Sequence, residues 1–131
     1  MVNNGIPLKN LVIFASGSGS NAEKIFEYFK DSTEVLITHI FSNNPEAGVI
    51  SRAERLAIPC TVFNRAEYKD GTLLKKIQSL NTDWVILAGF LWLIPSDFIQ
   101  AYPQRIVNLH PALLPKFGGK GMYGHFVHEA V

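Results

Sequence analysis

The sequence has few of the features that mark secreted, nucleic-acid-binding and membrane proteins. Its one cysteine is Cys60, so no disulfide can form within the chain. Twelve basic residues are balanced by eleven acidic ones, and the resulting formal charge of +1 supplies no field for steering the chain onto nucleic acid. We therefore expect no nucleic-acid partner and a reducing compartment, of which the cytoplasm is the simplest.

Long hydrophobic runs are also lacking. The longest uncharged apolar run covers residues 84–94, which is shorter than the roughly 20 residues needed to span a bilayer. The stretch from Met1 to Pro7 contains neither a basic nor an apolar segment, so we expect no signal peptide. These absences predict a protein without a membrane partner.

What is present is the composition of a globular domain. A chain of 131 residues has room for one domain. Hydrophobic residues make up 47% of it, which is enough to bury a core and too much for a disordered chain. We therefore treat residues 1–131 as a single folded unit.

Short apolar runs alternate along the chain with segments whose apolar residues recur at helical spacing. Buried strands are expected at residues 11–15, 34–41, 58–63, 84–88 and 105–110. Helices are expected at residues 21–30, 45–56, 68–80 and 95–102. This order predicts an α/β fold with a doubly wound, mostly parallel sheet and helices on both faces. After Pro111 we expect a glycine-rich loop at residues 116–124 and the start of a helix near residues 123–127.

The first expected strand leads into a glycine-rich turn, Ser16-Gly-Ser-Gly-Ser-Asn21. In a doubly wound sheet, ligands bind beyond the carboxyl ends of the strands. Backbone N–H groups and the partial positive charge of a helix N-terminus favour an anion there. The turn matches neither the dinucleotide-binding motif nor the P-loop. A tight turn with an N-cap serine is the structural alternative, but the position on the first βα connection favours a phosphate site.

The last expected strand carries two polar residues, Asn108 and His110, in an otherwise apolar stretch. Residues two apart lie on one face of a strand, so both side chains point to the same side near its carboxyl end. Buried Asn and His need partners, and the backbone or the following loop could supply them. We favour a catalytic pair, because an amide can stabilise an oxyanion and an imidazole can exchange a proton near neutral pH.

A metal site is not expected. His125, His128 and Glu129 lie close together, but their order, His-x-x-His-Glu, differs from the zinc-binding order His-Glu-x-x-His. We interpret these three residues as part of the surface.

Three segments occur in an order that is typical of one enzyme family: residues 12–21 (VIFASGSGSN), 87–94 (LAGFLWLI) and 108–115 (NLHPALLP). On these motifs, the chain resembles the folate-dependent formyltransferases over nearly its whole length. The resemblance implies a Rossmann-like fold with one formyltransferase domain over residues 1–131. It also implies transfer of a formyl group from 10-formyltetrahydrofolate to the amine of glycinamide ribonucleotide, a step of purine biosynthesis.

The resemblance assigns roles to individual residues. It implies that the substrate phosphate lies at Gly19, Ser20 and Asn21. The positions implied to contact the folate co-substrate are Arg65, Leu91, Trp92, Leu93, Ile94 and Asn108. His110 is implied to be the catalytic proton donor, and Asn108 to support it and to bind the oxygen of the tetrahedral intermediate. The chemistry implied needs no metal.

The family has one further catalytic group, an aspartate on a later loop, which would lie beyond residue 131. The resemblance therefore implies a domain truncated at its C-terminal end. We expect this chain by itself to be inactive. We also expect the uncovered apolar flank of its last strand to favour self-association.

Other functions stay open. A hydrolase that deformylates 10-formyltetrahydrofolate shares the Asn-x-His-Pro segment but needs no ribonucleotide phosphate site. Methionyl-tRNA formyltransferase shares the segment too, with an RNA-binding extension and more basic charge. A catalytically inactive nucleotide-binding module belongs to a different class. Formyl transfer to glycinamide ribonucleotide separates the first interpretation from these three.

Overall fold

The computed structural model describes residues 8–109, together with the backbone of residues 126–128. The strands are β1 (Lys9–Phe14), β2 (Val35–Ser42), β3 (Cys60–Val62), β4 (Trp84–Ala88), β5 (Ile106–Leu109) and β6 (Phe126–His128). The helices are α1 (Ser20–Phe29), α2 (Gly48–Leu56), α3 (Arg65–Lys69), α4 (Thr72–Ser79) and α5 (Ser96–Ala101). Within residues 8–109 and 126–128, none of the helices has the length and hydrophobicity of a transmembrane span.

The strands form one sheet in the order β3-β2-β1-β4-β5-β6. The first five strands pair in parallel, and β6 is antiparallel to β5. The chain builds outward from β1 to β3 and then crosses back, which places β4 on the other side of β1. This reversal is the topological switch point at which doubly wound folds bind ligands. The structure therefore confirms the doubly wound, mostly parallel fold expected from the sequence.

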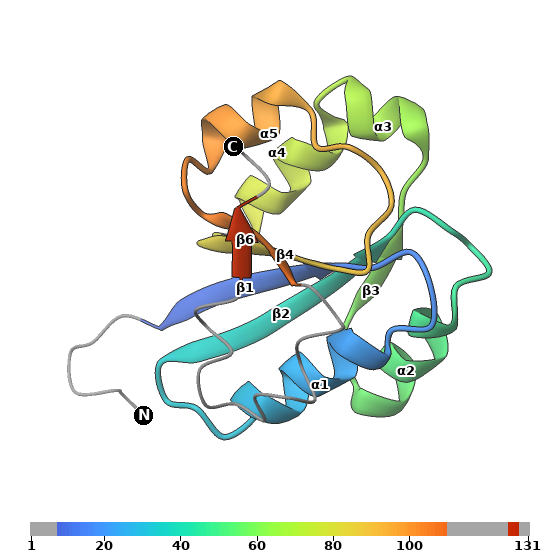
Figure 1. Cartoon of the computed structure of the whole chain (residues 1–131), viewed down its shortest axis with the longest axis vertical. Coiled ribbons are helices and arrows are strands. Elements are labelled where there is room, and N and C mark those ends of the chain that lie inside the picture. The colour runs from blue at the N-terminus through green and yellow to red at the C-terminus, as the bar shows by residue number, and fades with distance from the viewer. Residues whose placement is uncertain (1–7, 110–125, 129–131) are drawn as a thin grey trace.

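Helices cover both faces of the sheet, with α1 and α2 on one face and α3, α4 and α5 on the other (Figure 1). Strand β1 shows how the two cores arise. Leu11 and Ile13 belong to the core under α1 and α2, whereas Val12 and Phe14 belong to the core on the opposite face. All four side chains are buried. Because a strand covered on both faces needs apolar residues at every position, it appears in the sequence as a continuous apolar run.

The single helix expected over residues 68–80 is in fact two helices. α3 begins earlier, where the Asn64 side chain accepts the Glu67 N–H at 2.8 Å and the Glu67 carboxylate accepts the Asn64 N–H at 3.0 Å. This capping box fixes the start of α3. Gly71, at φ +92°, then separates α3 from α4. The expectation of one helix is wrong because the left-handed backbone at Gly71, which glycine adopts readily, interrupts it.

Residues 126–128 form a strand, where the sequence predicts a helix near residues 123–127. β6 pairs with β5 so that Val127 lies opposite Asn108. The open N–H and C=O groups along the flank of β5 offer backbone partners that local spacing cannot reveal. The helix prediction is therefore wrong for residues 126 and 127. His110 and the glycine-rich stretch 116–124 lie outside the described residues.

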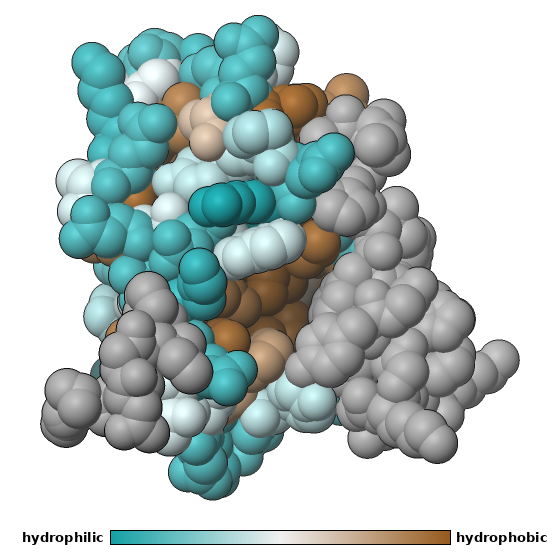
Figure 2. Space-filling model, turned by 90° about the vertical axis from the view of Figure 1, so that its left-hand side faces the viewer, coloured by the Kyte–Doolittle hydropathy of each residue, from teal (hydrophilic) through white to brown (hydrophobic). Residues whose placement is uncertain are grey.

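The two ends of the parallel strands differ in character. The strands begin on the left of Figure 1, and the turn from β1 into α1 lies on the right. Figure 2 shows the side at which the strands begin, where a hydrophobic area lies between hydrophilic residues. Near these strand starts, Leu8 and Leu36 are 39% and 47% exposed. The polar turns lie at the opposite, carboxyl end of the strands.

Candidate active site

Three loops meet at the carboxyl edge of the sheet, and Ser16 joins them. The Ser16 Oγ accepts a hydrogen bond from the Leu91 N–H at 3.0 Å. The Ser16 N–H donates to the Gly89 carbonyl at 3.2 Å, and the Ser16 carbonyl accepts from the Asn44 side-chain amide at 3.5 Å. Ser16 itself is buried. The turn after β1 is therefore fixed against the loops that follow β4 and β2.

The turn after β1 leads into the N-terminus of α1. Gly19, at φ +81°, is the N-cap, and Ser20 is the first helical residue. The Glu23 N–H bonds to the Gly19 carbonyl at 2.9 Å, so the N–H groups of Ser20 and Asn21 precede the first bond of the helix. The Ser20 N–H makes only a long contact, 3.4 Å, to the Ser18 Oγ. Such N–H groups suit an anion, and the N-cap is a glycine, not the serine of the structural alternative.

α2 packs directly against this turn. The Val49 N–H donates to the Gly17 carbonyl at 3.0 Å. A Cβ atom added to Gly19 would lie 2.7 Å from the Val49 Cα, and one added to Gly48 would lie 3.2 Å from the Ser18 Cα. Position 19 therefore requires glycine both for its positive φ and for lack of room.

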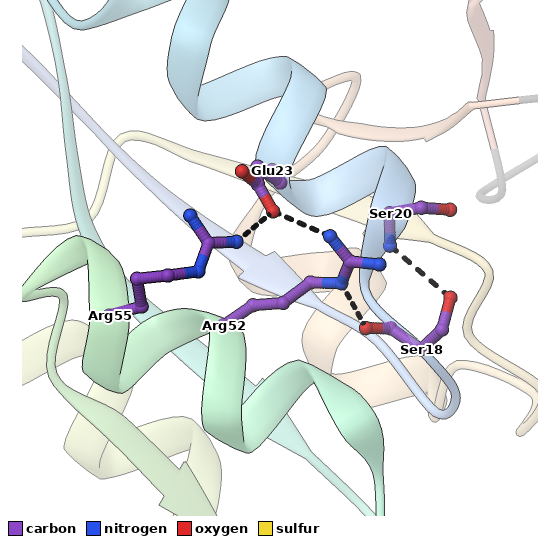
Figure 3. Close-up of polar contacts among 5 residues, drawn as sticks. All are labelled: Ser18, Ser20, Glu23, Arg52 and Arg55. Atoms are coloured by element: carbon purple, nitrogen blue, oxygen red, sulfur yellow. Dashed lines mark hydrogen bonds and ion pairs between the residues drawn. The ribbon is translucent and has the colours of Figure 1, made fainter.

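Charged side chains form a second link between α2 and the turn (Figure 3). Arg52 donates through Nε to the Ser18 carbonyl at 2.7 Å and through a terminal nitrogen to the Glu23 carboxylate at 2.6 Å. Arg55 donates to the same carboxylate oxygen at 2.6 Å. The hydrogen bonds from Arg55 and Arg52 lower the pKa of Glu23. The carboxylate is therefore ionised at neutral pH and holds both guanidinium groups.

The segment after β4 is held by side chains of α3. The Tyr68 hydroxyl donates to the Leu93 carbonyl at 2.8 Å. The guanidinium carbon of Arg65 lies 4.0 Å from the centre of the Trp92 ring. Leu91 and Leu93 are 81% and 87% exposed, whereas Trp92 is half-buried. The segment is thus anchored at Trp92 and projects two leucines into solvent.

Aromatic rings of the segment pack against Tyr68 of α3. The rings of Phe90 and Trp92 lie 5.9 and 5.4 Å from the Tyr68 ring, and Ile94 packs against the same core. A groove beside Trp92 is lined by Asn43, Pro45, Val62, Phe63, Asn64, Arg65, Glu67 and Trp92. The structure therefore brings Arg65 together with Trp92, two positions that are 27 residues apart in the sequence.

Asn108 lies near the carboxyl end of β5, half-buried and opposite Leu87 of β4. Because β4 leads into the segment at 89–94 and also pairs with β1, Asn108 shares the sheet edge with the turn at α1. His110 lies outside the described residues, so its expected convergence with Asn108 stays a prediction. Among the residues that the structure describes, no three His, Cys, Asp or Glu side chains gather as a metal site.

Two residues of this edge have roles that the sequence motifs did not assign. Ser16 is the first polar residue after the buried run at 11–15, and that position is a signal that could have singled it out. Arg52 carries no such signal. Its partners, Ser18 and Glu23, come from another part of the chain and reach it only because α2 packs beside α1.

These features define a Rossmann-like α/β domain in which a glycine turn at a helix N-terminus is joined to an aromatic-supported loop after the neighbouring strand. Residues 9–130 match the family described as formyl transferase. The chain belongs to this family.

The chain is similar to several proteins that are named as formyltransferases or transformylases. The chain is 44% identical over 130 residues to phosphoribosylglycinamide formyltransferase, chloroplastic, of Arabidopsis thaliana, which covers 94% of this chain and 44% of that protein. It is 33% identical over 130 residues to phosphoribosylglycinamide formyltransferase of Bacillus subtilis, over 95% of this chain and 67% of that protein. The crystal structure of glycinamide ribonucleotide transformylase 1 from Geobacillus kaustophilus matches with a TM-score of 0.74 and 35% identity, over 91% of this chain and 66% of that one. The chain thus spans from under half to about two thirds of the length of these relatives.

Proposed function

We propose that the protein transfers a formyl group from 10-formyltetrahydrofolate to the amine of glycinamide ribonucleotide, in purine biosynthesis. The observation that carries this proposal is the hydrogen bond from the Leu91 N–H to the Ser16 Oγ. This bond joins the glycine turn at α1 to the segment after β4. A ribonucleotide bound at the turn would therefore lie beside a folate bound at the segment. The names of the relatives from Arabidopsis thaliana and Bacillus subtilis support the same acceptor.

The phosphate of the acceptor binds at the start of α1 in this proposal. Gly19, Ser20 and Asn21 supply backbone N–H groups, and the last two add side-chain donors. The positive end of the α1 dipole favours the phosphate charge. A hydrogen bond to a charged group contributes about 1.5–3 kcal/mol, so two such bonds suffice to select a phosphorylated acceptor over an uncharged one.

The folate binds along residues 91–94 in this proposal. Backbone N–H and C=O groups of the segment hydrogen-bond the polar edge of the pterin ring, and Trp92 and Ile94 supply apolar surface. The exposed side chains of Leu91 and Leu93 are covered when the ring system binds. Arg65, which is exposed beside Trp92, pairs with a carboxylate of the glutamate tail.

Asn108 and His110 carry the chemistry in this proposal. The amine nitrogen attacks the formyl carbon, and the formyl oxygen becomes an oxyanion that accepts a hydrogen bond from the Asn108 amide. His110 donates a proton to the folate nitrogen as the bond between that nitrogen and the formyl carbon breaks. The attacking nitrogen loses a proton to solvent, which leaves a formylated amine and tetrahydrofolate. No step of this scheme passes through a metal.

The test is an assay of the full-length protein with formyl-labelled 10-formyltetrahydrofolate. The label is expected on glycinamide ribonucleotide, with little release as formate. Formate release at the same rate without the ribonucleotide would instead identify a deformylase. Phosphate binding without either reaction would identify an inactive nucleotide-binding module.

We also propose that the protein works in the cytoplasm. Its one cysteine, Cys60, is half-buried, and burial raises the pKa of the thiol, so the chain needs no oxidising compartment. Two plant relatives are named chloroplastic. Fluorescence imaging of the tagged full-length protein in its own cells distinguishes cytoplasm from plastid.

A further inference from the structure

We propose that Arg52 is a positioning residue, which holds the turn at Gly17–Asn21 in the shape that binds the phosphate of the acceptor. The inference rests on the function proposed above. It implies that α2, which is not part of the glycine motif, contributes to the affinity for the acceptor. Arg52 lies 31 residues beyond the end of that turn in the sequence. Figure 3 shows its side chain reaching from α2 to both the turn and the first part of α1.

One side chain bonds to two points that flank the phosphate-binding residues. The Arg52 Nε donates to the Ser18 carbonyl at 2.7 Å, before Gly19. A terminal nitrogen of the same guanidinium group donates to the Glu23 carboxylate at 2.6 Å, after Asn21. Because the guanidinium group is planar and rigid, these two bonds fix the position of the Ser18 carbonyl relative to the Glu23 side chain in the first part of α1.

The bond to the Ser18 carbonyl also sets the direction of a donor. The Ser18 carbonyl and the Gly19 N–H belong to one planar trans peptide group, so they point in opposite directions. Holding the carbonyl toward Arg52 therefore directs the Gly19 N–H away from α2. Glycine resists such rotation least of all residues, and the turn contains two glycines, Gly17 and Gly19. An external bond is therefore needed to keep this peptide in one orientation.

Backbone contacts of α2 act on the same turn. The Val49 N–H holds the Gly17 carbonyl at 3.0 Å, and Val49 fills the space beside Gly19. Arg52, one turn further along α2, adds a side-chain hydrogen bond to these backbone contacts. The Arg52 side chain is 35% exposed, so its removal leaves no cavity in the core and acts mainly on the turn.

Arg55 provides a matched control. It donates to the same Glu23 oxygen, at 2.6 Å, and carries the same charge. Only Arg52 also bonds to the Ser18 carbonyl. Removing either arginine therefore takes one positive charge from Glu23, but only the loss of Arg52 frees the Ser18–Gly19 peptide.

The experiment compares Arg52→Gln, Arg52→Lys and Arg55→Gln in the full-length protein. We measure kcat, the KM for each substrate and the inhibition constant of inorganic phosphate against the ribonucleotide. Arg52→Gln is expected to raise the ribonucleotide KM and the phosphate inhibition constant about tenfold, with the folate KM and kcat within about twofold of the parent protein. Arg55→Gln is expected to leave all four within about twofold.

Arg52→Lys keeps the charge and tests the geometry. A lysine has one nitrogen and cannot reproduce the rigid two-point contact, so the ribonucleotide KM is expected to rise at least about threefold. Equal effects of Arg52→Gln and Arg55→Gln would overturn the proposal in favour of a charge effect alone. Parent-like values in both Arg52 variants would overturn it as well. If the parent protein neither transfers formyl groups nor is inhibited by phosphate, the proposed function itself is wrong and this inference is rejected with it.

Discussion

The guanidinium carbon of Arg65 lies 4.0 Å from the centre of the Trp92 ring. This contact joins the start of α3 to the segment after β4, and the Tyr68 hydroxyl joins the same two elements through the Leu93 carbonyl. A cation stacked on an indole ring loses much of its freedom before any ligand arrives. Arg65 is therefore held in position beside the segment at which we place the folate.

Replacing Trp92 with Leu tests that arrangement. Leu keeps apolar bulk but removes the ring face, so Arg65 loses its stacking partner. Cation–π contacts contribute about 0.5–2 kcal/mol, and we expect the KM for 10-formyltetrahydrofolate to rise about threefold to tenfold. The ribonucleotide KM should stay within about twofold. Steady-state kinetics with each substrate varied in turn measures both, and a rise confined to the ribonucleotide KM would contradict the assignment.

Gly19→Ala tests the requirement for glycine at the N-cap of α1. The residue sits at φ +81°, and an added Cβ would meet the backbone of Val49. We expect a loss of stability greater than the roughly 1–2 kcal/mol that a left-handed conformation costs an L-residue. We also expect inhibition by phosphate to become undetectable.

Gly71→Ala is the matched control for that variant. Gly71 has a similar positive φ of +92°, but a Cβ there would meet nothing within 4 Å. Only the backbone cost of about 1–2 kcal/mol should appear in urea unfolding, with phosphate inhibition unchanged. If both variants lose phosphate inhibition equally, the effect is one of global stability and not of the turn.

Asn108→Ala and His110→Ala test the catalytic pair. Loss of one oxyanion donor or one general acid costs on the order of 10²–10³ in turnover. We expect kcat of the full-length protein to fall by that factor in each variant, while the ribonucleotide KM changes less than about threefold. Near-normal turnover in His110→Ala would remove His110 from the mechanism.

His39 predicts how stability depends on pH. Burial, with a smaller effect from the positive charge of Lys76, lowers the pKa of His39 below its ordinary value of 6.5. The folded state then binds a proton less readily than the unfolded state, so the stability that His39 contributes is complete above about pH 6.5 and is lost as the pH falls toward the lowered pKa. Urea unfolding between pH 5 and pH 8 should show this decline.

His39→Gln is the comparison variant for the pH series. The difference in unfolding free energy between the two proteins should shrink as the pH falls from 7 to 5, because only the parent loses the contribution of a neutral His39. In the parent, the ring stacks on Phe41 at 4.5 Å and its Nε2 lies 2.8 Å from the Thr61 hydroxyl oxygen. A pH-independent difference would show that His39 does not titrate in this range.

The order of the strands and helices could be predicted from the sequence because local pattern determines it. β1 appears as an unbroken apolar run since both of its faces are covered, and α1 and α2 show apolar residues at helical spacing. The split between α3 and α4 required weighing Gly71 as a breaker. β6 could not be predicted, because it forms by pairing with the open flank of β5, which the local spacing of residues 123–127 does not reveal.

Some features of the candidate site could likewise be predicted from the sequence, and others could not. The glycine turn follows a buried strand directly, so its position was visible in residues 16–21 alone. The pairing of Arg65 with Trp92 and the reach of Arg52 to Ser18 depend on how helices pack, which no local motif encodes. For Ser16, the sequence shows its position directly after the buried strand, but it does not reveal the hydrogen bond to Leu91.

The phosphate site is tested most sharply by comparing kcat/KM of the full-length protein for two formyl acceptors, glycinamide ribonucleotide and its dephosphorylated riboside. If the turn at Gly19, Ser20 and Asn21 holds the phosphate, the riboside loses at least two hydrogen bonds to a charged group, about 3 kcal/mol or more. We predict that kcat/KM for the riboside is at least about 100-fold lower. Values for the two acceptors within about threefold of each other would contradict a phosphate site at the start of α1.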